Sequence, residues 1–287
     1  MSGATSTPAA PGDLDRLFQP EWAGGWALAR VLFAVAAFAE HWRFAFGIGD
    51  AFGVPDMVFT TGWYRLADFF YMSPELAWAF WLAGMIAVPM IAYGGKWFRP
   101  GMILFAIGFW GLIGYEALNV KAHDRLLTWV GIGLFFSPAG ERDLTSKYRS
   151  PAARYWLLIV YGAIYFSTGI LKFLYEPMWI TGEALQWHLV ETYHAGNWRA
   201  AWVSGQRWLT TPMGWITLIF EIGFPFLVVF RKTNPWLLLM GTLFHLGLLL
   251  TMYVGAFAFV ALSMYPVLLH PEVARGLYER FKAWRAR

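Results

Sequence analysis

The stretch Ile164-Tyr-Phe-Ser-Thr-Gly-Ile-Leu-Lys172-Phe-Leu-Tyr-Glu-Pro-Met-Trp179-Ile-Thr-Gly-Glu-Ala-Leu185 ends an apolar segment of membrane-spanning length and leaves one lysine in its last turn. A lysine at the rim of a membrane helix can be an anchor, with its ammonium among the lipid headgroups. It can also be a partly desolvated amine that gives up its proton and acts as a base near neutral pH. The sequence therefore predicts a membrane helix here, and the role of Lys172 separates a structural interpretation from a chemical one.

Composition places the whole chain among integral membrane proteins. Hydrophobic residues make up 58% of its 287 residues, aromatic residues 20% and charged residues 14%, whereas charged residues are about a quarter of a soluble domain. With no cysteine, the chain has no disulfide, thiol nucleophile or thiolate metal site. Its net charge of +4 is spread among loops, so the expected partner is the lipid bilayer and not nucleic acid.

The apolar blocks predict an all-α polytopic bundle of about eight spans. They cover roughly 22–42, 74–93, 101–118, 125–138, 152–172, 212–230, 235–253 and 255–269. Lysine and arginine concentrate in the loops after alternate spans and in the segment after the last one. By the positive-inside rule, this predicts a multi-pass membrane protein with both termini in the cytoplasm.

Three parts of the chain are expected to differ in character. Residues 1–20 are rich in Ser, Ala, Pro and Gly and predict a disordered cytoplasmic tail. Residues 21–270 form the transmembrane domain, and 271–287 form a basic cytoplasmic tail. The segment 173–211 alternates Trp, His and Arg with apolar residues and predicts amphipathic helices on the outer interface.

Ionisable residues inside predicted spans are costly and mark candidate sites. Glu221 lies in the middle of the sixth span and His245 in the middle of the seventh. For each of them a structural role and a functional role remain open. In this topology His123 and Lys172 lie near the outer face, so these four side chains can line one outward-opening cavity.

The helix that ends at Lys172 also offers two hydroxyl groups on one face. Tyr165, Thr168 and Lys172 are separated by three and four residues, a spacing that aligns side chains along a helix. A hydroxyl can therefore bond the amine.

Metal binding and serine hydrolysis are not predicted. The six histidines include no His-x-x-x-His spacing, and only His188 and His194 stand close together, on the predicted interfacial segment. The chain also lacks a Gly-x-Ser-x-Gly nucleophile turn.

Two groups of motifs, taken together, point to a known family. The first is the run from Tyr165 to Lys172, followed by Trp179 and by Gly-Glu-Ala-Leu at 182–185. The second is Leu-Phe-His at 243–245, followed by Gly-Ala-Phe-Ala-Phe at 255–259 and Tyr-Pro at 265–266. Over about residues 20–270 the chain resembles the membrane domain of vitamin K-dependent gamma-carboxylases, which also defines the horizontally transferred transmembrane family of bacteria.

The resemblance implies a chemistry and a set of site residues. In the carboxylases a neutral lysine deprotonates reduced vitamin K, and oxygen converts the quinol to an epoxide. The strong base so formed takes a proton from a substrate glutamate, to which carbon dioxide adds. By this resemblance Lys172 is the catalytic base and His123 orients it. The pocket for reduced vitamin K or menaquinol would be lined by Glu221, His245, Tyr165 and Thr168.

Three functions follow, and the sequence leaves open whether the protein is an enzyme. The first is a carboxylase-like or quinol epoxidase-like enzyme that uses a prenylquinol and a lysine base in an outward-facing cavity. The second is a maturation factor for a small secreted peptide, and the third is a non-catalytic quinone-binding or scaffolding membrane subunit. Peptide carboxylation is the weaker expectation. The carboxylases carry a large extramembrane domain after their spans, whereas about seventeen residues follow the last predicted span here.

Overall fold

The computed structural model describes residues 18–46, 48, 72–114, 122–191 and 198–287. In these residues the protein is all-α, apart from one antiparallel pairing between β1 (Glu21–Trp22) and β2 (Tyr148–Arg149). The predicted all-α class is confirmed. Most of the predicted disordered tail, residues 1–17, lies outside the described residues.

The long helices follow the predicted apolar blocks. In chain order they are α2 (Gly24–Phe44), α4 (Pro74–Tyr93), α5 (Phe98–Ile113), α6 (Ala122–Phe136), α7 (Ala152–Tyr175), α11 (Arg207–Leu227) and α12 (Asn234–Thr251), and the last block forms α13 (Phe257–Ser263) and α14 (Tyr265–Leu268). The segment predicted to lie at the interface contains α8 (Met178–Thr181), α9 (Glu183–Val190) and α10 (Trp198–Ser204). Shorter 3₁₀ turns η3 (Gly95–Trp97), η5 (Pro138–Gly140) and η6 (Leu144–Ser146) join helices, and α15 (Pro271–Arg285) follows α14.

Fewer helices qualify as membrane spans than the sequence predicted. Among the described residues, α4, α7 and α12 are long and apolar enough to cross a bilayer, and a fourth span is counted if 257–268 and 271–285 are taken as one bent span. α2 is as long as α4 but carries Arg30, Glu40 and Arg43. The apolar helices support a bilayer environment, and the count of eight spans stays a prediction.

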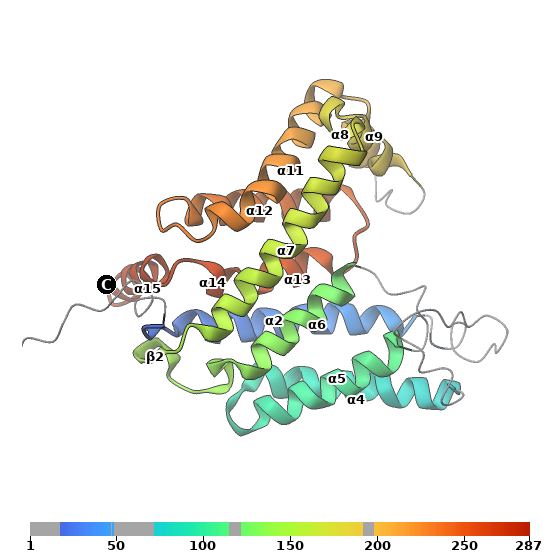
Figure 1. Cartoon of the computed structure of the whole chain (residues 1–287). Helices are drawn as coiled ribbons and strands as arrows, with labels where there is room; N and C mark the ends of the chain where they lie inside the picture. The colour runs from blue at the N-terminus through green and yellow to red at the C-terminus, as the bar shows by residue number, and fades with distance from the viewer. Residues whose placement is uncertain (1–17, 47, 49–71, 115–121, 192–197) are drawn as a thin grey trace, which may run out of the picture.

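Figure 1 shows α2 in the middle of the bundle, with α4 and α5 packed against each other on one side of it. α7 runs diagonally across the bundle from β2 to α8 and α9, and α11 packs along α7. The short helices α13 and α14 pack against α2. One buried cluster joins these elements and includes Phe33, Phe105, Leu127, Tyr161 and Phe224.

The loops after alternate predicted spans lie together at one end of the bundle. β1, before α2, pairs with β2 in the α6–α7 loop. The α6–α7 loop reaches the end of α4, since Arg142 Nη2 donates to the Tyr93 hydroxyl at 3.2 Å. The α11–α12 turn reaches α15 through an ion pair of 2.5 Å between Arg231 and Glu272. We call this the basic end. It gathers the loops rich in lysine and arginine that the sequence predicts on one side of the membrane.

An ion-pair network stiffens the α6–α7 loop at the basic end. Glu141 accepts hydrogen bonds of 2.8 and 2.5 Å from Arg149 and one of 3.1 Å from Lys147. These bonds, that of Arg149 first, lower the pKa of Glu141 to about 2. The loop therefore keeps its ion pairs throughout the physiological pH range, although exposed pairs of this kind add little to the free energy of unfolding.

Large apolar side chains cover the outer faces of several helices. Exposed examples are Trp78, Leu82 and Ile86 on α4, Ile159 and Leu171 on α7, and Trp236, Leu239 and Leu243 on α12. Contiguous apolar surface of this kind is rare on soluble monomers. Lipid acyl chains are its natural solvent.

Small residues allow α4 and α5 to approach closely, as is common between helices in membranes. A Cβ atom added at Gly108 would lie 2.5 Å from the Phe80 carbonyl oxygen and 2.6 Å from the Gly84 backbone nitrogen. Both obstacles are backbone atoms, so no side-chain movement can relieve the contact.

We expect Gly108→Ala to destabilise the protein by about 1–3 kcal/mol, because α5 must move away from α4 to admit the methyl group. Thermal unfolding in detergent measures this change. Gly247→Ala in α12 is the matched control, since no atom lies within 4 Å of its added Cβ, and it should be neutral or stabilise by about 0.5–1 kcal/mol. Equal stability of the two variants would contradict the close packing of α4 and α5.

Candidate functional site

Lys172 stands in the last turn of α7 and turns inward to α11. Its Nζ donates to both carboxylate oxygens of Glu221, at 2.6 and 2.8 Å. The Lys172 side chain is 22% exposed and that of Glu221 is 7% exposed. The indole of Trp179 completes the surroundings, with Nζ 4.7 Å from a ring centroid, which is a cation–π distance. We call these three side chains the Lys172–Glu221 centre.

The chain reversal after α7 places Trp179 beside Lys172. Trp179 Nε1 donates to Glu176 Oε2 at 2.6 Å, which fixes the indole just beyond the end of α7. Gly182 follows with a φ of +81°, a conformation that residues with a Cβ resist. A Cβ there would also lie 2.5 Å from the Thr211 nitrogen. Gly182 therefore lets α8 fold back onto α11.

α7 and α11 are close together at the level of Glu221. A Cβ at Gly169 would lie 2.7 Å from the Glu221 Cβ and 3.0 Å from the Ile222 nitrogen. The Glu221 carboxylate is thus enclosed between two helices, and Lys172 supplies the positive charge that a buried carboxylate requires.

Further along α7, Tyr165 forms a second polar contact. Its hydroxyl lies 2.7 Å from His245 Nε2 and 3.5 Å from the Tyr265 hydroxyl. The rings of Phe220 and Phe224 pack on Tyr165, with centroids at 4.9 and 4.7 Å. The structure therefore joins Tyr165 and His245, two predicted pocket residues, in a buried hydrogen bond between α7 and α12.

Thr168 lies one turn before Lys172 on α7, and its side chain forms a hydrogen bond with that of Glu221. Its hydroxyl donates to the carbonyl oxygens of Ile164 and Tyr165, at 2.9 and 3.0 Å, and the side chain is exposed. Bonding to the preceding turn is the usual behaviour of threonine within a helix. The structure therefore places Thr168 beside Glu221, and a role of Thr168 in binding a quinol stays a prediction.

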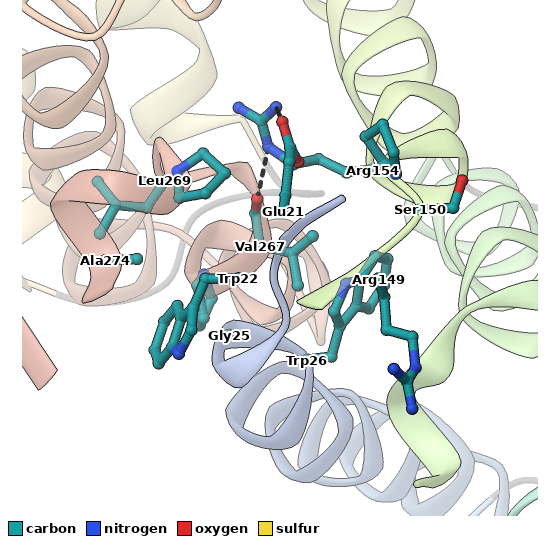
Figure 2. Close-up of a pocket in the computed structure, with 13 residues that line it drawn as sticks. Glu21, Trp22, Gly25, Trp26, Arg149, Ser150, Arg154, Val267, Leu269 and Ala274 are labelled. Atoms are coloured by element: carbon teal, nitrogen blue, oxygen red, sulfur yellow. Dashed lines mark hydrogen bonds and ion pairs between the residues drawn. The ribbon is translucent and has the colours of Figure 1, made fainter. Parts of the chain in front are cut away.

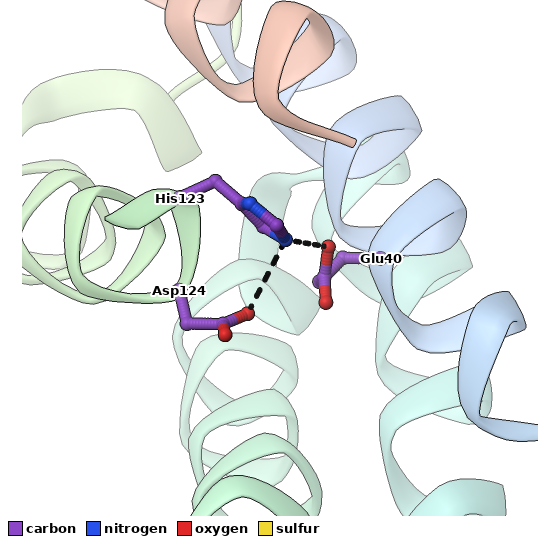
Figure 3. Close-up of side chains that lie close together, drawn as sticks. All are labelled: Glu40, His123 and Asp124. Atoms are coloured by element: carbon purple, nitrogen blue, oxygen red, sulfur yellow. Dashed lines mark ion pairs between the residues drawn. The ribbon is translucent and has the colours of Figure 1, made fainter. Parts of the chain in front are cut away.

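His123, the second predicted catalytic residue, lies in a different cluster, which Figure 3 shows. Its Nε2 is 2.9 Å from Glu40 Oε2 and 3.7 Å from Asp124 Oδ1. Arg43 bonds Glu40 through Nε, and its Nη2 lies 3.2 Å from Asp124 Oδ1. The histidine and both acids are buried. We call these four residues the α2–α6 cluster.

The lengths of α6 and α7 explain why His123 is not level with Lys172. The two helices pack side by side, and Trp156 Nε1 donates to the Trp129 carbonyl oxygen at 3.0 Å. His123 is six residues from Trp129, whereas Lys172 is sixteen residues from Trp156. At 1.5 Å per residue, the ten additional residues carry Lys172 about 15 Å further. Among the described contacts, His123 therefore meets α2 and does not reach Lys172.

Comparison with known protein families covers nearly all of the residues described above. The profile of the HTTM domain matches residues 18–272. The chain belongs to the HTTM domain family. HTTM is the membrane domain found in vitamin K-dependent gamma-carboxylases, so the resemblance seen around Lys172 is confirmed. No curated protein and no solved structure matches the chain.

In this HTTM domain the α2–α6 cluster contains the donor atoms of a possible metal site. Ligand atoms of Glu40, His123 and Asp124 all lie within 4.8 Å of one another, and carboxylates and imidazole are ligands for zinc and related ions. Arg43, however, already contacts both carboxylates and supplies positive charge to them. Spacing rules for paired histidines do not detect this cluster, because it contains one histidine. The signal in the sequence is the three-residue spacing of Glu40 and Arg43, which puts them on one face of α2.

Two neighbouring grooves run between α5 and α6 of the HTTM domain. The larger has a volume of about 260 Å³ and is lined by apolar side chains such as Phe105 and Phe109. The smaller, of about 230 Å³, shares Trp110 and Thr128 with it and extends to Asp124 of the α2–α6 cluster. The size and lining of the larger groove suit an apolar chain.

A much smaller pocket lies at the basic end of the HTTM domain, as Figure 2 shows. Its volume is about 20 Å³, enough for one water molecule. Arg154 crosses it, with Nε donating to the Val267 carbonyl oxygen at 3.1 Å and Nη1 to Glu21 at 3.2 Å. Burial raises the pKa of Glu21, and the charge of Arg154 opposes that shift. This pocket is a structural junction of β1, α7 and α14.

Proposed function

We propose that this HTTM domain protein is a membrane enzyme that acts on a prenylquinol, and that the Lys172–Glu221 centre transfers the proton. The direction of Lys172 is the observation that carries the proposal. An interfacial anchor extends its ammonium toward the lipid headgroups. Lys172 instead turns inward and binds a carboxylate that is enclosed between helices.

The pair has a route to a neutral amine. While Lys172 holds its proton it cannot accept another, but the 2.6 Å hydrogen bond leads directly to a Glu221 oxygen. A bound substrate that displaces water from the pair would remove solvation from both ions, and so favour transfer of that proton to Glu221. Lys172 can then accept a proton from an acidic hydroxyl group while Glu221 holds the first one.

The residues around the centre fit a prenylquinol. When bound, a hydroquinone supplies an acidic hydroxyl group and two electrons. The buried indole of Trp179 lies beside Nζ and keeps water from one side of the amine. Leu171 and Phe173, on either side of Lys172 in the sequence, are exposed apolar side chains, so an isoprenoid tail at this place would meet apolar surface and lipid.

The same proposal includes an orientation in the membrane. The basic end gathers the loops that follow alternate predicted spans, and it would face the cytoplasm of a bacterial inner membrane. Lys172 lies at the opposite end of α7 from β2. The Lys172–Glu221 centre would therefore open to the outer side, within an eight-span topology that leaves both termini in the cytoplasm.

Quinone content tests the proposal through binding. The full-length protein is purified with its lipids, supplied with menaquinone, and extracted for quantification of quinone per protein. We expect stoichiometric quinone in the parent and a loss in the double variant Lys172→Met/Glu221→Leu, because apolar replacement of both partners keeps α7 and α11 packed. Arg207→Gln is the matched control, since its side chain is 65% exposed near α9, and it should retain quinone.

Each other result assigns a different function. A parent protein without quinone would contradict the proposal and favour the maturation of a small secreted peptide. Quinone retained in full by the double variant would place the ligand elsewhere, such as the α5–α6 grooves, and would make the Lys172–Glu221 pair a clamp in a scaffolding subunit.

A further inference from the structure

α15 leaves the bundle at a sharp bend and stands apart from the core. The segments 257–268 and 271–285 meet at an angle of 91°. Figure 1 shows α15 at the β1 and β2 side of the molecule, which is the basic end. None of its residues is buried, so packing within the protein does not account for its side chains.

One face of α15 is apolar and uncovered. Val273, Leu277, Phe281 and Trp284 are separated by four, four and three residues and therefore share a face of the helix. Leu277, Phe281 and Trp284 are 53%, 57% and 70% exposed. A row of large apolar side chains with this exposure is typical of a binding surface.

Charged side chains are arranged around that face. At 100° per residue, Arg280 and Arg285 border the apolar face on its two sides, and Lys282 lies beyond Arg285. Glu272 and Glu279 lie on the opposite side of the helix. Basic residues beside an apolar face are typical of helices in a membrane interface, because long basic side chains reach the headgroups while the apolar face enters the acyl region.

Contacts with the bundle hold α15 by its other side. The ring of Tyr278 lies 5.6 Å from that of Trp22 in β1, and Glu272 forms its ion pair with Arg231. Arg275 also bonds the Tyr148 hydroxyl in β2. Around the helix, Glu272 and Arg275 lie opposite Leu277, and Tyr278 lies between Arg275 and the edge of the apolar face. The apolar face is therefore turned away from the protein.

We propose that α15 lies in the membrane–water interface at the basic end, on an anionic lipid surface. Leu277, Phe281 and Trp284 enter the acyl region, and Arg280 and Arg285 bind anionic headgroups. A membrane protein with its basic loops at this end already places α15 beside a negatively charged leaflet. A second copy of the chain is a poorer partner, because pairing two such faces would bring their arginines together.

Depth labelling tests the proposal, and the absence of cysteine gives a background free of other thiols. Phe281→Cys in the full-length protein is labelled with a fluorophore that responds to polarity and is placed in nanodiscs of phosphatidylcholine and phosphatidylglycerol. We expect blue-shifted emission that nitroxide-labelled lipid quenches. Glu279→Cys is the matched control from the opposite face, and its label should emit as in water and be quenched by iodide.

Two outcomes would overturn the interfacial position. A label at position 281 that iodide quenches as strongly as the control label would show a helix free in water. A label protected from both quenchers would show a protein contact, such as a second copy of the chain.

The charge of the lipid is tested in the same labelled background. We expect the blue shift of the Phe281→Cys label to grow when phosphatidylglycerol replaces part of the phosphatidylcholine, and to shrink with salt. Arg280→Gln/Arg285→Gln should remove this dependence, whereas Arg207→Gln, near α9, should leave it intact. Equal emission of the parent label in neutral and anionic nanodiscs would overturn the assignment to anionic lipid.

Discussion

Lys172→Arg is expected to abolish prenylquinol turnover in a protein that still folds. Arginine keeps the long stem and the positive charge, so it can still pair with Glu221. With a pKa above ~12, it does not give up its proton and cannot act as a base. General acid–base catalysis contributes about 10²–10⁴-fold, and a loss of that size is expected in oxygen uptake with reduced menaquinone, while thermal unfolding stays close to that of the parent.

A charge-swapped variant separates the chemistry from the packing. Lys172→Glu combined with Glu221→Lys keeps an ion pair between α7 and α11 but moves the amine to the other helix. If the amine must stand on α7, this variant folds and does not turn over. If Lys172→Arg and the swapped variant both keep the parental turnover, the pair only joins two helices and the catalytic assignment of Lys172 is wrong.

Arg43→Leu is expected to cause the largest loss of stability, about 3–5 kcal/mol, because it removes one partner from a buried ionic network. Glu40 and Asp124 are both fully buried, and Arg43 bonds each of them. Without it, both carboxylates would lose a positive charge that now pairs with them. Thermal or denaturant unfolding of the purified protein at neutral pH measures the change.

Arg43→Lys is the matched control for that loss. It keeps the positive charge and gives up the planar group that bonds two carboxylates at once, so its stability should lie between those of the parent and Arg43→Leu. Parental stability of Arg43→Leu would show that the α2–α6 cluster does not hold these helices together.

The helices could be predicted from the sequence where local signals bound them. α4 covers 74–93 in both the prediction and the structure. Its first turn has Pro74 after the capping residue Ser73, whose Oγ accepts from the Leu76 nitrogen at 3.2 Å, and Gly94 ends it with a φ of +75°. Signals of this kind act within a few residues, so a single sequence contains them.

Boundaries without such signals were less predictable. α11 begins at Arg207, five residues before the predicted start at 212, because hydropathy does not reveal a helical turn that carries polar residues. The last apolar block divides between α13 and α14 at Met264. Pro266 in the first turn of α14 is the local signal of that division, and the apolar pattern alone does not show it.

The candidate site was predictable only in part, because its contacts depend on tertiary packing. Lys172 and Glu221 were placed in one predicted cavity, and the structure joins them directly. The contact of His123 with Glu40 spans α2 and α6 and depends on how far each helix extends. No local pattern contains that information. The family resemblance implies that His123 orients Lys172. This role stays a prediction, because His123 has no contact with Lys172 among the described residues.

Oxygen uptake by the pure full-length protein in lipid, supplied with reduced menaquinone, tests the central claim most directly. The proposed chemistry predicts protein-dependent uptake that equals the loss of quinol mole for mole, with quinone epoxide and water as products. It also predicts no such uptake by the folded Lys172→Arg protein. Uptake no greater than that of protein-free lipid, measured on parent protein that is folded and loaded with menaquinone, would contradict the account.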